Sequence, residues 1–269
     1  MLSSVDERRP LYADFGWNST SQLYAEPIEV PRSPVTGRAL ILAVEDFQNR
    51  LSARSLQQNP FWLAMVEQPR LVPEQVFYGM CIENYHLLCR ESYFDSPALS
   101  FAFSQTLRLK FNMFYCEEIG HDRLLLKALN AIGLTEEALF TSVPLRETMA
   151  LCNALSYWAR HDPIFFFTTL GPLEGRDVEV DSYVRAAREK NLADAFVSPI
   201  EAHANINKNS AHGLLTRELF ESIDVVSSAD CARVLQQTAL FVALYDQFYA
   251  AIWQHYSHQQ NLLRPLADI

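Results

Sequence analysis

Two pairs of acidic and histidine residues are separated by three positions. Glu118 precedes His121 in FNMFYCEEIGHDRLLLKAL, residues 111–129, and Glu83 precedes His86 in CIENYHLLCR, residues 81–90. Side chains three positions apart lie on the same face of a helix, so each pair can converge on one point. Carboxylates bridge and neutralise metal ions, and imidazole adds a neutral donor. A Glu-x-x-His pair directed into a helical bundle is therefore typical of a carboxylate-bridged di-iron site.

Helical periodicity favours the pair at Glu118 as an inward-facing one. Glu118 falls on the same stripe as four apolar residues, Phe111, Phe114, Leu125 and Leu129. The alternative for such a pair is a solvent-facing carboxylate beside a hydrogen-bonded core histidine.

The pair Glu83 and His86 is open to three interpretations. Its side chains are alternative metal ligands, partners that orient a metal-bound imidazole, or core polar groups satisfied by neighbours such as Tyr85 and Arg90.

A second cluster lies in SPIEAHANINKNSAHGLL, residues 198–215. His203 and Asn207 are four positions apart and share a helical face, whereas His212 falls on the opposite side, with Asn209 among its neighbours. Both histidines reach one site only if the helix is locally unwound or contains a π-bulge. The alternative is that one histidine is a ligand and the other a surface residue.

Between these clusters, Glu174 follows apolar Leu173 and lies close to the run Phe165-Phe166-Phe167. A carboxylate here can bridge two metals, although Glu in such a position is more often an exposed turn residue. The sequence contains no G-x-S-x-G, H-E-x-x-H, G-x-x-x-x-G-K or G-x-G-x-x-G motif. The sequence therefore does not support a function as an α/β-hydrolase, a zincin, a P-loop protein or a dinucleotide-binding protein.

The elements that must position these residues are helices. Apolar spacing is helical almost everywhere from residue 39 onward, and alternating β-branched runs are missing. We predict an all-α fold with an extended N-terminal arm over residues 1–38, which is rich in Pro and Gly, and a helical-bundle catalytic domain over residues 39–269. Asp95-Ser96-Pro97 caps a long helix that runs without Pro or Gly to Gly120 and is expected to continue to a C-cap at Gly133, so that it includes both Glu118 and His121. Other helices are expected near residues 60, 73–93, 163–172, 178–192, 198–222 and 228–261.

Composition limits the class of protein. The formal net charge is −10, with acidic residues spread along the chain, so nucleic acid is not an expected partner. The N-terminus lacks the apolar core of a signal peptide and no later stretch resembles a membrane span, so we expect a soluble, cytoplasmic protein without a membrane partner. The five cysteines are expected to be buried, reduced thiols.

The order of these features resembles that of the haem-oxygenase-like diiron oxidases, relatives of the TenA thiaminases and the pyrroloquinoline quinone synthase PqqC. The likeness covers about residues 55–260. In that family a first core helix supplies a Glu and a His, which correspond to Glu118 and His121. A later helix supplies a Glu, here Glu174.

A third core helix of the family supplies a His-x-x-x-Asp-x-x-His set. His203 and His212 correspond to its histidines, but Asn207 or Asn209 stands where the family has Asp, and the second histidine is displaced by two residues. Asn is a weaker, neutral ligand, so one of the two implied iron ions is expected to be held less tightly.

The resemblance implies a bundle of about seven core helices, two iron ions and O₂ as co-substrate. The implied reaction is N-oxygenation, desaturation or oxidative C–C cleavage of a small amine, amino acid or fatty-acid-like molecule. Four aromatic residues are expected to exclude water and shape the pocket: Phe111, Phe114, Phe165 and Phe166. The N-terminal arm is expected to lie against the bundle or against a second subunit of a homodimer.

Two alternatives remain. One is a metal-free enzyme on the same scaffold, like the TenA thiaminases or PqqC, whose histidines bind or protonate an organic substrate. The other is a non-catalytic helical interaction module, in which the inward Glu and His are satisfied core groups.

Overall fold

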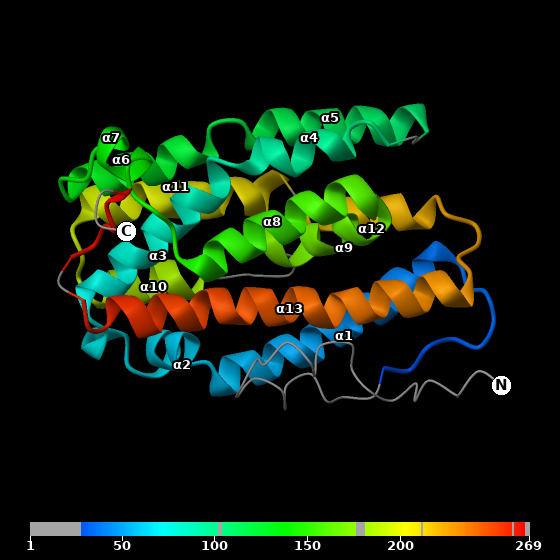
Figure 1. Ribbon diagram of the computed structural model, residues 1–269, viewed down its shortest axis with the longest axis horizontal. Helices are drawn as coiled ribbons and strands as arrows, with labels where there is room; N and C mark the ends of the chain where they lie inside the picture. Colours follow the sequence, from blue (N-terminus) through cyan, green and yellow to red (C-terminus); the bar gives the residue numbers. More distant parts are fainter. Residues whose placement is uncertain (1–27, 102–103, 176–180, 211, 260, 267–269) are drawn as a thin grey trace.

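The computed structural model describes residues 28–101, 104–175, 181–210, 212–259 and 261–266, without the side chains of residues 207–213. The predicted N-terminal arm lies mostly outside these residues. The all-α prediction is confirmed, since the described residues contain no strand beyond two isolated bridges, Val35 with Val226 and Ser142 with Pro265. The helices, shown in Figure 1, are α1 Gly37–Gln58, α2 Pro60–Glu67, α3 Glu74–Leu88, α4 Asp95–Ala98, α5 Gln105–Glu118, α6 His121–Ala131, α7 Glu136–Phe140, α8 Arg146–His161, α9 Pro163–Leu173, α10 Ser182–Glu189, α11 Asp194–Ser210, α12 His212–Glu221 and α13 Ser228–Tyr256.

Helix α13 is the axis around which the bundle is built. It is 29 residues long and runs along most of the molecule in Figure 1. Its buried residues recur at helical spacing around more than one face, from Cys231 to Tyr256, and it packs against α1, α2, α3, α8 and α9. Because one helix contacts five others, its apolar sequence fixes the relative positions of most of the core.

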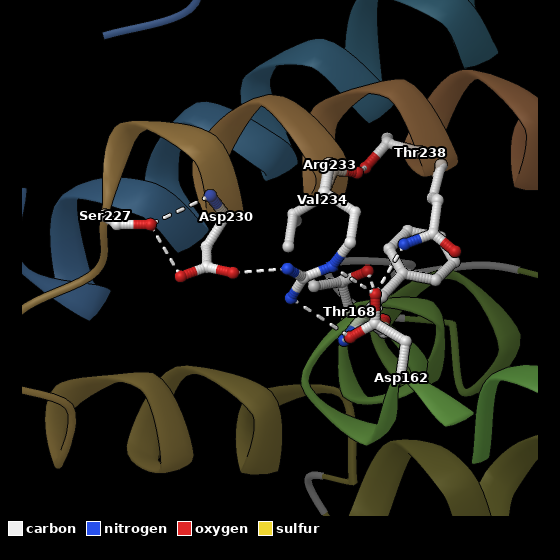
Figure 2. Close-up of polar contacts among 9 residues, drawn as sticks. Asp162, Thr168, Ser227, Asp230, Arg233, Val234 and Thr238 are labelled. Carbon is white, nitrogen blue, oxygen red and sulfur yellow. Dashed lines mark hydrogen bonds and ion pairs between the residues drawn. The ribbon is translucent and has the colours of Figure 1, made fainter. Parts of the chain in front are cut away.

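A polar junction fixes α9 on α13. Asp162 caps α9 by accepting a hydrogen bond from the backbone N–H of Phe165 at 3.3 Å, and Pro163 takes the first helical position. Figure 2 shows Arg233 of α13 between Asp162 and Asp230; its Nε donates to Asp162 Oδ2 at 2.7 Å. The junction sets the start of α9, whose other end leads into Glu174.

The upper layer of the bundle in Figure 1 contains α4, α5, α6 and α11. Helix α6 packs against both α11 and α3, while α9 packs on α12. No helix among the described residues is long and apolar enough to span a membrane.

Candidate metal centre

Glu118 and His121 lie on two different helices. The sequence predicts one regular helix through both, and this is wrong, because α5 ends at Glu118 and α6 begins at His121. Between them Gly120 has a φ of +99°, in the left-handed region that residues with a Cβ rarely adopt. The two side chains nevertheless converge, with His121 Nδ1 2.6 Å from Glu118 Oε2 and both side chains only 4% exposed.

This close approach is not a hydrogen bond. Neither ring nitrogen of His121 has a hydrogen-bond partner among the described residues. Two donors bound to one metal at about 2.1 Å each lie about 3 Å apart. Glu118 and His121 are therefore close enough to bind a common cation.

His203 of α11, a helix that packs on α6, lies beside His121. Its ring is perpendicular to that of His121, with the centroids 4.8 Å apart. Its Nε2 is enclosed and has no hydrogen-bond partner in the described chain. Burial, followed by the nearby His121, lowers the pKa of His203 to about 4, against the opposing effect of Glu118. His203 is therefore a neutral donor at physiological pH.

Two further carboxyl groups, which the sequence reasoning missed, stand beside this cluster. Asp95 of α4 is 5% exposed, and burial together with Glu174 and Glu118 raises its pKa well above the usual value. Burial likewise raises the pKa of Glu91, and neighbouring carboxyl groups raise it further. Glu118 and Glu174, the predicted bridging carboxylate, both raise the pKa values of Glu91 and Asp95, so Glu174 lies near the same acidic groups as Glu118. Such a concentration of acidic groups is stable in ionised form only with cations nearby.

A cavity of about 160 Å³ opens beside Glu118. Its charged lining residues are all acidic: Glu91, Asp95, Glu118 and Asp122. Ser92 and Tyr115 add hydroxyl groups, and the lining contains no Lys, Arg or His. The cavity is therefore suited to a small, positively charged molecule.

The four predicted aromatic residues are buried. Phe111, Phe114, Phe165 and Phe166 are each at most 6% exposed, and the ring of Phe111 contacts that of Phe167 with centroids 4.4 Å apart. Phe111 and Phe114 occupy the buried face of α5 that also carries Glu118. This face therefore keeps the carboxylate in apolar surroundings.

Glu83 belongs to a separate network. It is fully buried and accepts hydrogen bonds from Leu145 N at 3.0 Å, Thr148 Oγ1 at 2.5 Å and Tyr256 OH at 2.7 Å, with Arg264 Nη2 at 3.4 Å. Burial raises its pKa, while these donors oppose the rise. Both carboxylate oxygens have partners, so the network supports a structural role for Glu83.

His86 is satisfied in the same part of the core. Its Nε2 lies 3.2 Å from Ser142 Oγ, and Arg90 Nη1 lies 3.4 Å from its Nδ1. Burial and, to a smaller extent, the charges of Arg90 and Arg264 lower the pKa of His86 to about 4. Of the three interpretations of this pair, the geometry favours satisfied core groups.

Three predicted residues, Asn207, Asn209 and His212, have side chains outside the described set. The helix predicted over residues 198–222 corresponds to α11, Asp194–Ser210, and α12, His212–Glu221, with residue 211 outside the described residues. Among the side chains that are described, no group of three or more His, Cys, Asp or Glu is arranged around one metal position. The described donors thus amount to a partial ligand set.

Two solved structures share this fold. A domain of unknown function with a heme oxygenase-like fold from Shewanella denitrificans OS217 matches with a TM-score of 0.65 and 16% identity, over 80% of this chain and 93% of that one. A TenA family transcription regulator from Silicibacter sp. TM1040 matches with a TM-score of 0.53 and 17% identity, over 77% and 96% of the two chains. No protein-family model and no curated protein matches the sequence. The chain therefore has the haem-oxygenase-like fold that its motifs imply.

Proposed function

We propose that the chain is an O₂-dependent oxidase that holds two non-haem iron ions between α5, α6 and α11. The observation that carries the proposal is the convergence of Glu118, His121 and His203, with enclosed imidazole nitrogens, inside a region rich in carboxyl groups. Carboxylate and imidazole are the donors that non-haem iron prefers. Glu174, Asn207 and His212 complete the proposed ligand set.

Bound iron would supply the electrons for O₂ reduction and the oxidising power for attack on the substrate. The chain itself orients and shields the site. His121 and His203 would supply imidazole donors, and Glu118 would offset the positive charge. Phe111 and Phe114 keep bulk water away from the Glu118 side, where a lower local dielectric strengthens each electrostatic contact.

The acidic lining of the cavity supports a small amine as the substrate over a fatty acid. Glu91, Asp95 and Asp122 lie around the opening beside Glu118, where they would attract an ammonium group and repel a carboxylate. Within the oxidative chemistries implied by the fold family, N-oxygenation or oxidation next to nitrogen suits this arrangement best.

Anaerobic loading with Fe(II), followed by iron analysis and an optical spectrum on mixing with O₂, tests the proposal. We expect bound iron in the wild type and an O₂-dependent absorption change. Glu118→Gln should lose both, while Glu137→Gln, at an exposed position of α7, should keep both and so serves as a matched control. Iron content that is unaffected by Glu118→Gln would contradict the assignment.

A metal-free enzyme on the same scaffold is the second candidate. The observation in its favour is that acidic groups and the Tyr115 hydroxyl line the cavity, which would allow acid–base chemistry on a cationic substrate without a metal. A protein stripped of iron by chelation that still converts an amine substrate in the absence of O₂ would establish this candidate instead.

A further inference from the structure

Helix α5 carries an apolar stripe on its solvent-facing side. Leu109 is 57% exposed and Met113 is 62% exposed, and Cys116 is exposed on the same face. The opposite face of the helix is the buried one. Figure 1 shows α5 along the upper edge of the molecule. An isolated exposed apolar residue is ordinary, but three aligned on one helix face indicate a contact surface.

The spacing within the stripe is that of a helix–helix seam. Leu109, Met113 and Cys116 follow one another at intervals of four and three residues, the alternation found at the contact positions of paired helices. A second helix with the same pattern would insert its side chains between them. The exposed face of α5 therefore suits another α5.

Charges beside the stripe determine the orientation of that pairing. Lys110 and Glu117 are seven residues apart and flank the stripe on the same side. In an antiparallel pair each Lys110 faces the partner's Glu117, whereas in a parallel pair the two copies of this flank lie on opposite sides of the seam and these charges do not meet. Lys110 also pairs with Glu218 of its own chain, and both side chains of this pair are nearly half exposed. An ammonium group has three N–H donors, so Lys110 can bind both carboxylates.

We infer that α5 is an interface between two copies of this chain, which pack their α5 helices antiparallel about a twofold axis. In this arrangement each Met113 lies against the partner's Cys116, and two reciprocal ion pairs close the seam. The self-complementary charges commit the surface to a second copy rather than to an unrelated protein. One helix pair is a small interface, so we expect a dimer with a dissociation constant on the order of micromolar.

The inference is independent of the proposed chemistry, yet it bears on the same site. Helix α5 carries Glu118 on its inner face, and Tyr115 and Glu118 line the cavity. Within the described part of the chain, the main packing partner of α5 is α12. A second copy seated on its outer face would hold this helix, and therefore Glu118, in place.

Sedimentation velocity of the full chain over a range of concentrations tests the association. We expect a monomer–dimer equilibrium for the wild type and a monomer for Met113→Glu, with the same circular dichroism spectrum because Met113 is exposed. Met149→Glu, at a partly exposed position on α8, should remain dimeric and is the matched control. A wild type that is monomeric at about 100 µM, or a Met113→Glu variant that still dimerises, would overturn the inference.

Cross-linking tests the antiparallel orientation. In a Cys89→Ser background, which removes another exposed thiol, Met113→Cys should form a covalent dimer under mild oxidation through Cys116 of the partner. Adding Cys116→Ser should abolish the cross-link. Absence of any covalent dimer, or a cross-link that persists without Cys116, would overturn the arrangement.

Charge reversal gives a second test of orientation. Lys110→Glu and Glu117→Lys should each raise the dissociation constant at least about tenfold, since each places two like-charged contacts in the interface. Combining both changes should restore dimerisation toward the wild-type value. A double variant weaker than either single variant would contradict reciprocal pairing.

Discussion

The imidazole rings of His121 on α6 and His203 on α11 stand perpendicular to each other, with centroids 4.8 Å apart. Both have an Nε2 atom without a hydrogen-bond partner in the described chain. Buried imidazole nitrogens are normally satisfied, so these two atoms are the ones that the proposed iron site would occupy.

The two histidines should not be equivalent. We expect His121→Ala to lose more iron than His203→Ala, because His121 is already in contact with Glu118, whereas His203 approaches from a separate helix. Iron per chain after anaerobic loading and desalting measures the difference. An unchanged iron content in His121→Ala would remove His121 from the ligand set.

Gly120 should be required for the geometry of the site. Gly120→Ala places a Cβ in open space, so its effect comes from the backbone alone, a loss of about 1–2 kcal/mol at a positive φ. Relaxing that strain would rotate Glu118 away from His121 and weaken iron binding. Gly133→Ala is the matched control, since Gly133 has a φ of +87° and equally open surroundings at the other end of α6. It should lower stability similarly, as measured by urea unfolding, and leave iron binding unchanged.

The metal-free protein should be less stable at high pH. The raised pKa of Asp95 means that the folded state holds a proton that the unfolded chain releases. The contribution of this bound proton to stability is therefore fully present below pH 3.8, the ordinary pKa of Asp. It is lost as the pH rises through the raised pKa of Asp95 in the folded state. With chelator present, urea unfolding should show lower stability at about pH 8 than at about pH 5, and Asp95→Asn should reduce this difference. An identical pH dependence in Asp95→Asn would contradict the coupling.

Tyr256 should contribute stability without affecting iron. Its hydroxyl donates to the buried Glu83 at 2.7 Å. Tyr256→Phe should lower the free energy of unfolding by about 1.5–3 kcal/mol, because a hydrogen bond to a charged or partly charged buried group is lost. Tyr157→Phe, at an exposed tyrosine of α8, should change it by less than about 0.5 kcal/mol. Iron content should match the wild type in both variants, and a selective loss in Tyr256→Phe would connect the Glu83 network to the metal site.

The sequence predicted the fold class and the burial of Glu118 because both depend on local spacing. The stripe through Phe111, Phe114 and Glu118 places the carboxylate inside, and the structure agrees. The same stripe hid the break at Gly120, since apolar periodicity resumes at Leu125 after the turn and a single glycine is compatible with a continuous helix.

Glu91 and Asp95 were not predictable in the same way. They belong to a 3-10 turn and a four-residue helix, elements too short to show periodicity. Only tertiary packing brings them beside Glu118. His203 was a candidate from its sequence context, but its contact with His121 depends on how α11 packs on α6, which local spacing does not encode.

The Glu83 network also determines when this protein can complete its core during synthesis. Glu83 emerges from the ribosome early, yet its partner Tyr256 follows 173 positions later, and Arg264 follows later still. Leu145 and Thr148 can satisfy one oxygen of Glu83 earlier, but until residue 256 is present the other oxygen lacks its donors, and burying it would be unfavourable. We therefore expect α3 to reach its final packing only after α13 has formed.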